Sequence, residues 1–220
     1  MRVRIAGIDE AGRGPLAGPV VAAAVILKPG PRISGIADSK VLAPEVRVEL
    51  DGIIRRRALC FGIGWADPAE IDALNILHAT FLAMRRAVLA MAVMPHRLII
   101  DGNRLPKLEG LGAELRAQAI VGGDATEPAI SAASILAKTA RDRYMSRMDA
   151  IYPQYAFASH KGYATAKHRR LLEEHGPCPL HRRSFSPVEA RLAALHAGGP
   201  HLDEGEWDAQ FEALLEVDEP

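Results

Sequence analysis

Hydrophobic and polar residues alternate from the start of the chain, and this two-residue period predicts a β-strand over residues 2–9. Residues 20–27 form a continuous apolar and largely β-branched run, which is typical of a strand buried on both faces. Residues 59–65 alternate large apolar side chains with small ones and predict a third strand. Short apolar runs at 97–100 and 117–121 predict two further buried strands.

Three- and four-residue spacing of apolar side chains predicts helices between these strands. A proline opens a helix-like segment over residues 44–57. Asp67-Pro68 is a strong start for the next helix, because an aspartate side chain can cap it and proline suits its first position. We expect this helix to break near Asn75 and to end at Pro95.

A long helix is expected after residue 121, with Thr126 as its cap and Pro128 in its first turn, and residues 187–196 also have a helical pattern. The order of the main elements is strand, strand, strand, helix, strand, strand, helix. This order indicates an α/β domain in which hairpin-linked strands come first and crossover-linked strands follow.

Aspartates follow three of the predicted strands. Asp9, with Glu10 beside it, ends the first strand, and Asp101 and Asp124 follow the fourth and fifth. Taken singly, each could be a turn residue or a helix cap. Carboxyl ends of neighbouring strands commonly form a site in α/β sheets, so the coincidence favours convergence. Convergent carboxylates need cations, and oxygen ligands favour Mg²⁺ or Mn²⁺, two of which can clamp an in-line displacement at phosphorus.

The segment Gly12-Arg13-Gly14 comes directly after the first acids. It is neither a phosphate-binding P-loop nor a Gly-x-Gly-x-x-Gly dinucleotide fingerprint, which argues against a nucleotide-binding α/β enzyme of another reaction class. Its glycines would let the backbone approach a sugar-phosphate closely. On its own, the tripeptide is a weak signal.

Charge is distributed unevenly along the 220 residues, although the net charge is zero. Residues 192–220 contain eight acids and no Lys or Arg, which leaves 27 basic and 19 acidic residues in 1–191. An excess of positive charge over the body of the chain suits a polyanionic partner, but a solvated surface of mixed charge explains it equally well.

The remaining composition is that of an ordinary globular domain, with 49% hydrophobic and 25% charged residues. No apolar run is long enough to span a membrane, and the alternating pattern begins at once, so we expect neither a span nor a signal peptide. Cys60 and Cys178 lie far apart in no metal-like spacing, which predicts reduced thiols in a cytoplasmic protein.

Ordered motifs run through residues 3–191. They are Ile8-Asp9-Glu10-Ala11-Gly12-Arg13-Gly14-Pro15-Leu16-Ala17-Gly18-Pro19, Asp38-Ser39-Lys40, Asn75-Ile76-Leu77-His78-Ala79-Thr80, Ile100-Asp101-Gly102-Asn103, Gly123-Asp124, Ile130-Ser131-Ala132-Ala133-Ser134-Ile135-Leu136-Ala137-Lys138, Arg141-Asp142, His160-Lys161-Gly162-Tyr163 and Arg182-Arg183-Ser184-Phe185. In this series the chain resembles bacterial ribonuclease HII, a type 2 ribonuclease H.

The resemblance implies a ribonuclease H-like fold, in which a mixed five-stranded sheet is flanked by helices and followed by a C-terminal helical part. It implies an endoribonuclease that cleaves the RNA strand of RNA–DNA hybrids and incises duplex DNA 5′ of embedded ribonucleotides, leaving a 5′-phosphate and a 3′-hydroxyl. Four metal-binding carboxylates are implied, with two Mn²⁺ or Mg²⁺ ions: Asp9, Glu10, Asp101 and Asp124.

By the same resemblance, Gly12-Arg13-Gly14 reads the 2′-hydroxyl at an RNA–DNA junction, and Tyr163 packs against the sugar next to the scissile bond, favouring deoxyribose on its 3′ side. Six further residues suit phosphate contacts, which position a duplex without reading its sequence: Ser39, Lys40, Ser134, Lys138, Lys161 and Ser184. For Lys138, a solvated helix face is an equal alternative. His160 is expected to support the Tyr163 loop. Gly122 stands where relatives often carry a lysine.

We expect a catalytic domain over residues 1–197 and an acidic, flexible tail over 198–220. The tail could also bind a partner or cover the basic groove, and Gln210-Phe211-Glu212-Ala213-Leu214-Leu215 fits a sliding-clamp peptide only poorly. A monomer is expected, because no exposed apolar stripe demands an oligomer. The main rival is an inactive relative that binds hybrid duplexes without cutting, although such a binder gains nothing from carboxylates facing phosphates.

Overall fold

The computed structural model describes residues 3–30, 33–36, 42–112 and 115–198. Its centre is a five-stranded sheet with the order β3-β2-β1-β4-β5. The strands are β1 (Ile5–Ala11), β2 (Val20–Leu27), β3 (Ala58–Ala66), β4 (Arg97–Asp101) and β5 (Arg116–Ile120). Strands β1, β2 and β3 pair antiparallel, whereas β4 pairs parallel with both β1 and β5. The expected mixed sheet is therefore confirmed.

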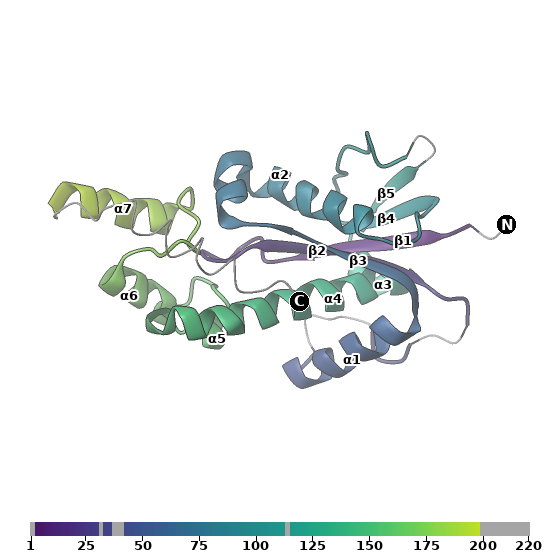
Figure 1. The fold of residues 1–220 in the computed structure, drawn as a ribbon, viewed down its shortest axis with the longest axis horizontal. Coiled ribbons are helices and arrows are strands. Elements are labelled where there is room, and N and C mark those ends of the chain that lie inside the picture. The colour runs from purple at the N-terminus through teal and green to yellow at the C-terminus, as the bar shows by residue number, and fades with distance from the viewer. Residues whose placement is uncertain (1–2, 31–32, 37–41, 113–114, 199–220) are drawn as a thin grey trace.

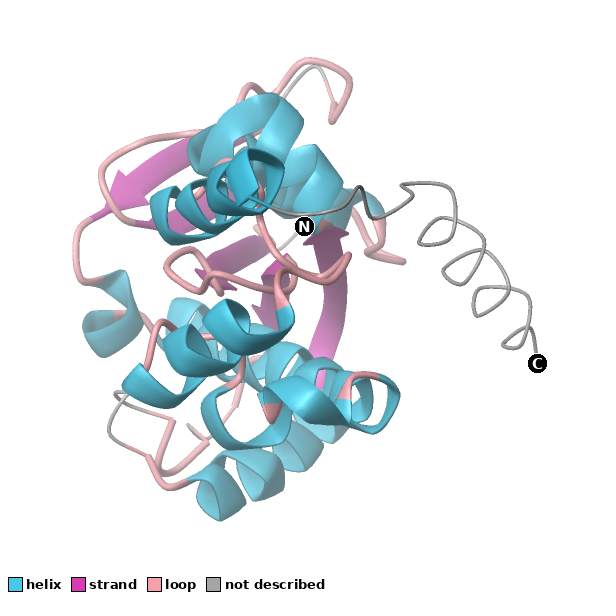
Figure 2. Ribbon diagram, turned by 90° about the vertical axis from the view of Figure 1, so that its left-hand side faces the viewer, coloured by secondary structure: helices cyan, strands magenta, loops and turns pink. Residues whose placement is uncertain are grey.

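Helices cover both faces of this sheet (Figures 1 and 2). Helix α2 packs on one face against β2 and β3, and α4 packs on the other against β1 and β2, with α1 beside it. The helical elements are α1 (Pro44–Arg57), α2 (Pro68–Leu89), α3 (Gly123–Thr126), α4 (Pro128–Ile151), the 3₁₀ turn η1 (Pro153–Tyr155), α5 (Phe157–His160), α6 (Ala166–His175) and α7 (Ser186–Gly198).

Strands β1 and β2 form the middle of the core, with side chains buried on both faces of the sheet. Gly7 of β1 allows α4 to approach unusually closely, since a Cβ at this position would lie 2.2 Å from the carbonyl carbon of Ala129. The first turn of α4 therefore rests directly on the backbone of β1. This contact brings the segment before α4 next to the end of β1.

Several boundaries differ from the sequence predictions, and β5, predicted as a buried strand, is a partly exposed strand at the edge of the sheet. Strand β1 continues past Asp9 to Ala11. Helix α2 ends at Leu89 rather than at Pro95, because the chain turns there and buries Met91 in the core. Thr126 does not cap α4: its hydroxyl donates to Gly122 O within the separate short helix α3.

The predicted break in α2 is confirmed. Asn75 has φ 65° and ψ 161°, outside the helical region, and its side-chain oxygen accepts hydrogen bonds from the backbone N–H groups of Leu77 (3.0 Å) and His78 (3.3 Å). The asparagine thus caps the second half of the helix, as short polar side chains do at helix starts. Residues other than glycine rarely adopt this pair of angles, so the two hydrogen bonds hold the chain at a strained point.

The C-terminal elements η1, α5, α6 and α7 lie beyond the end of the sheet where β1 passes into β2 (Figure 1). Backbone hydrogen bonds join them to the loop 12–19 between these strands, from Leu16 N to Gly162 O (2.9 Å) and from Gly18 N to Leu180 O (2.7 Å). The first loop of the chain and its C-terminal part therefore form one unit.

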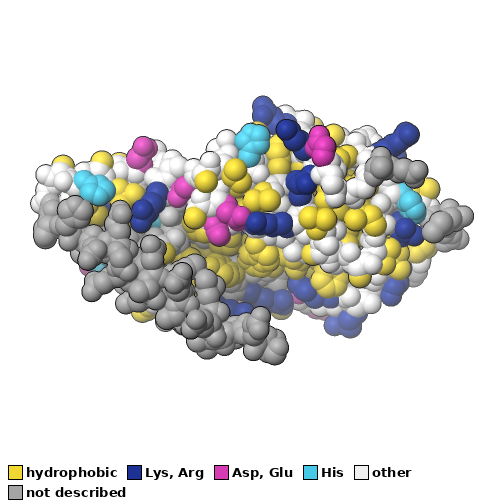
Figure 3. Space-filling model, turned by 45° about the horizontal axis from the view of Figure 1, so that its top comes forward, with side chains coloured by type: hydrophobic (Ala, Val, Ile, Leu, Met, Phe, Trp, Pro, Cys, Tyr) yellow, Lys and Arg dark blue, Asp and Glu magenta, His cyan; other side chains and the backbone are white. Residues whose placement is uncertain are grey.

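On the face that Figure 3 presents, Lys and Arg side chains are spread over the sheet-bearing half of the molecule and interleaved with hydrophobic ones. Among the described residues, no helix is both long and apolar enough to cross a membrane.

Candidate active site

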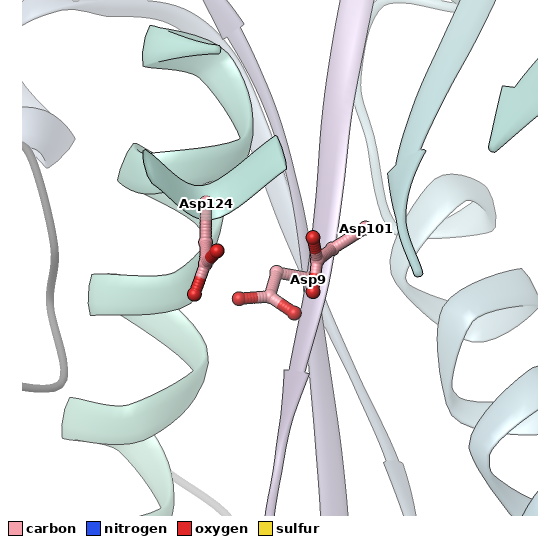
Figure 4. A group of neighbouring side chains, drawn as sticks. All are labelled: Asp9, Asp101 and Asp124. Carbon is pink, nitrogen blue, oxygen red and sulfur yellow. The ribbon is translucent and has the colours of Figure 1, made fainter. Parts of the chain in front are cut away.

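Three of the four predicted carboxylates meet at one point (Figure 4). Asp9, Asp101 and Asp124 each offer a carboxylate oxygen, and these three oxygens all lie within 4.8 Å of one another. Asp9 and Asp124 are buried, whereas Asp101 is partly exposed. The site therefore opens to solvent on the side of Asp101.

Neighbouring elements deliver these side chains. In the β1–β4 ladder Ile8 is opposite Ile100, so Asp9 and Asp101 are the next residues on adjacent parallel strands. The Asp101 carboxylate accepts a hydrogen bond from Gly123 N (2.8 Å), which fastens the end of β4 to the turn that follows β5. That turn begins the short helix α3, which carries Asp124.

Glu10 follows Asp9 on β1, but its carboxylate is not one of the three that converge. Its carboxylate accepts a hydrogen bond from Arg13 Nη1 at 3.3 Å. Asp9, for its part, accepts a hydrogen bond from the backbone N–H of Glu10 (2.8 Å). Among the described residues, the structure thus brings together three of the four predicted ligands and places the fourth beside them, paired with the loop arginine.

Burial, and then the nearby negative charge of Glu10, raise the pKa of Asp9 to about 8. A hydrogen bond from the Ser134 side chain acts in the opposite direction. A buried group of acids retains a proton at neutral pH because no positive charge compensates its negative charge, and a bound cation would supply that charge. Hard oxygen ligands of this kind fit a divalent cation such as Mg²⁺ or Mn²⁺.

We predict that Asp9→Asn stabilises the metal-free protein as the pH rises. Between pH 4 and 8 the folded Asp9 carboxyl keeps its proton while the unfolded one releases it, so wild-type stability falls with rising pH. Asparagine lacks this titration, and the variant should gain roughly 1 kcal/mol per pH unit relative to wild type. Urea unfolding in a chelator at several pH values measures the difference. A difference in stability between the two proteins that does not change between pH 4 and 8 would contradict the prediction.

Two arginines that the sequence assigned no role hold the loop 12–19. Arg141 and Arg182 are both fully buried. They donate hydrogen bonds to five carbonyl oxygens of the loop, those of Gly12, Arg13, Ala17, Gly18 and Pro19. Burial, and then the charge of Arg141, lower the pKa of Arg182 to about 9, which leaves it charged at neutral pH. The loop is therefore held from within by two cations.

Tyr163 lies beside this loop and is exposed, with 41% of the residue's surface accessible. The Nζ atom of Lys138 and the guanidinium carbon of Arg141 lie 5.5 and 5.7 Å from the ring centroid. Lys138 also forms an ion pair with Asp142 at 2.6 Å. The Lys138 side chain is therefore in place between an acid and the predicted sugar-contacting ring.

The other predicted phosphate contacts are held by internal hydrogen bonds. Ser134 is buried beside Asp9, Lys161 Nζ donates to Ser146 Oγ and to Ala158 O, and Ser184 Oγ donates to Asp72. Asp72, to which the sequence assigned no role, also accepts the backbone N–H groups of residues 183 and 184. Ser39 and Lys40 lie outside the described residues.

The family model for ribonuclease HII matches residues 6–188 of the chain. The chain belongs to the ribonuclease HII family. It is thus an endoribonuclease of the ribonuclease H type 2 class, a hydrolase, and the aspartate cluster is consistent with dependence on a metal ion.

Individual members of the ribonuclease HII family agree with this placement. A ribonuclease HII from a Polaromonas species is 58% identical over 184 residues, covering 84% of this chain and 90% of the relative. The crystal structure of ribonuclease H2 from Pyrococcus horikoshii is 25% identical with a TM-score of 0.78, covering 89% of this chain and all of that one. The ribonuclease HII of Archaeoglobus fulgidus in complex with PCNA is 26% identical with a TM-score of 0.64, covering 84% and 96%.

Proposed function

We propose that this endoribonuclease cleaves the RNA strand of RNA–DNA hybrids and incises duplex DNA immediately 5′ of embedded ribonucleotides, with two divalent metal ions. The observation that carries the proposal is the convergence of Asp9, Asp101 and Asp124 within 4.8 Å at the ends of adjacent elements. The products are a 5′-phosphate on the ribonucleotide and a 3′-hydroxyl on the upstream DNA. Its role is the removal of ribonucleotides from DNA.

Asp9, Glu10, Asp101 and Asp124 are the residues that would hold Mg²⁺ or Mn²⁺. When bound, such ions supply activation of a water molecule and stabilisation of the leaving oxygen. The protein's own contribution is to hold the carboxylates in place before the substrate arrives, through the Gly123 N–H on Asp101 and the Ser134 hydroxyl on Asp9. Release of Glu10 from Arg13 would complete the set.

The loop Gly12-Arg13-Gly14 is proposed to recognise the 2′-hydroxyl of the ribonucleotide. Because the carbonyl oxygens of Gly12 and Arg13 accept hydrogen bonds from the buried Arg182, the N–H groups of this segment are proposed to face the ligand. A 2′-hydroxyl is the group that distinguishes RNA from DNA, and it can accept such a hydrogen bond. Tyr163 is placed to pack on the neighbouring sugar.

We propose that residues around this centre contact phosphate groups of the duplex. Such contacts position the duplex without reading its base sequence. These residues are Ser39, Lys40, Ser134, Lys138, Lys161 and Ser184.

We assign the catalytic domain to residues 1–197 and regard residues 198–220 as an acidic tail outside it. The protein acts on nucleic acid as a monomer. The ribonuclease HII solved with PCNA leaves a clamp contact through the tail as a further option.

A labelled DNA duplex containing one ribonucleotide tests the proposal, with an all-DNA duplex as its control. We expect one cut 5′ of the ribonucleotide that requires Mg²⁺ or Mn²⁺, and no cut in the control, because only the former has a 2′-hydroxyl. Binding without cutting would favour the inactive relative. Neither binding nor cutting, before and after deletion of residues 198–220, would reject the proposal.

A further inference from the structure

A group of buried histidines lies beneath Tyr163 and takes no part in the chemistry proposed above. His168 is fully buried, and His181 and Cys178 are nearly so. His168 Nε2 lies 3.1 Å from His181 Nε2, and His181 Nδ1 lies 3.2 Å from Cys178 Sγ. At the other end of the chain of contacts, His168 Nδ1 lies 2.9 Å from the carbonyl oxygen of Tyr163.

The neighbours of each ring determine which nitrogen carries its proton. The backbone N–H of Cys178 donates to His181 Nδ1 (3.0 Å), so the His181 proton is on Nε2. The Tyr163 carbonyl can only accept, so His168 carries its proton on Nδ1. His181 Nε2–H then donates to the free Nε2 of His168. All the hydrogen bonds therefore run in one direction, from Cys178 through both rings to Tyr163.

This arrangement requires neutral rings. A second proton on His168 would sit on Nε2 and face the His181 Nε2–H at the 3.1 Å contact, and a second proton on His181 would sit on Nδ1 and face the Cys178 N–H at 3.0 Å. Burial lowers the pKa of His168 to about 4 and of His181 to about 3, so both are neutral at physiological pH. His160 stacks on His168 with ring centroids 4.3 Å apart, and its Nδ1 accepts the N–H of Gly162 at 3.2 Å.

The chain of hydrogen bonds ends on the turn that carries the Tyr163 ring. The same turn is fastened on its other side, where Gly162 O accepts the N–H of Leu16 from the loop 12–19. The Tyr163 ring projects from this doubly held backbone with only two side-chain torsions free. The position of its backbone therefore largely decides where the ring meets a sugar.

We propose that His168, oriented by His181, is a positioning residue that sets the placement of Tyr163 and through it the preference for deoxyribose 3′ of the scissile bond. This proposal rests on the sugar-contacting role of Tyr163 given under the proposed function. His168 and His181 touch neither substrate nor metal. Cys178 closes the outer end of the chain, so the effect of substitution should decrease from His168 to His181 to Cys178.

The experiment measures kcat/KM on two substrates, a DNA duplex with one ribonucleotide and a continuous RNA–DNA hybrid. We expect His168→Leu to lower the ratio of the first value to the second about tenfold, and to leave the ratio unchanged when Tyr163→Ala is already present. His168→Asn, whose amide can still donate toward the Tyr163 carbonyl, should keep most of the preference. Ile54→Ala, a buried change in α1, serves as the control for lost stability and should not move the ratio.

Equal losses on both substrates, or a further loss on top of Tyr163→Ala, would assign His168 a structural role and overturn the proposal. If His168→Leu does not fold, His168→Asn and nitrogen-15 NMR of the wild-type imidazoles decide instead. The expected result is the Nδ1–H form for His168 and the Nε2–H form for His181, and the reverse assignment overturns the proposal. Failure of the wild type to cut either duplex would instead be a failure of the proposed function.

Discussion

Asp101→Asn is expected to reduce turnover at least about a thousandfold while the protein still folds and binds its duplex. Asp101 ends β4 and supplies one of the three converging oxygens. Asparagine keeps an oxygen that can accept the Gly123 N–H, so the local structure survives. Mg²⁺ sites obtain negative charge from carboxylates, however, so the loss of one charge weakens the binding of the divalent cation. Single-turnover cleavage, circular dichroism and fluorescence anisotropy measure the three quantities.

A matched control is Glu45→Gln, which neutralises an exposed acid in the first turn of α1, away from the site. This variant should cut at the wild-type rate. If Asp101→Asn also turned over at a near wild-type rate in Mg²⁺, the assignment of the three aspartates as metal ligands would be wrong.

Gly12→Ala should lower the stability of the protein, whereas Gly14→Ala should lower its cleavage efficiency, although the two positions are only two residues apart. Gly12 has φ +95°, and a Cβ there would lie 2.1 Å from Arg141 Nε, in a guanidinium that three carbonyl oxygens hold in place. We expect Gly12→Ala to lower the free energy of unfolding by about 3 kcal/mol or more, since backbone strain and overpacking add. A Cβ on Gly14 meets no atom within 4 Å.

Gly14→Ala should therefore unfold like the wild type and yet cut ribonucleotide-containing DNA about tenfold or more less efficiently, because the new methyl group stands where the backbone would approach the sugar. Urea unfolding and kcat/KM, measured on both variants, separate these outcomes. Unchanged kcat/KM in a stable Gly14→Ala protein would contradict close approach of the sugar to the backbone at Gly14. Unchanged stability in Gly12→Ala would contradict the packing of Gly12 against Arg141.

The sheet could be predicted from the sequence because its strands are bounded and strongly patterned. The run 20–27 lies between Pro19 and Pro29, and the observed β2 has the same bounds. Asp101 and Asp124 were recognisable because each follows such a run. Their convergence also depends on the strand order, which puts β4 between β1 and β5, and the hydrophobic pattern does not give this order.

Features that depend on distant contacts could not be predicted. Arg141 belongs to a polar stripe of α4 that the periodicity places on a separate face, yet the C-terminal part and the loop 12–19 bury it completely. Arg182 is one of two adjacent arginines, and only the fold distinguishes the buried one from its exposed neighbour. The Thr126 cap failed for a similar reason, since the separate helix α3 occupies the residues before Pro128.

The distance along the chain between the loop 12–19 and its arginines has a consequence for the protein during its synthesis. Arg182 and the Gly12 carbonyl that it holds are 170 residues apart, whereas the last proposed metal ligand is Asp124. A growing chain on the ribosome therefore contains every acid of the centre well before it can fasten the loop. Distant contacts form only after both partners have been made. The loop 12–19 is therefore fastened later than the metal-binding residues are synthesised. The C-terminal segment that fastens this loop is thus the last part of the site to be made.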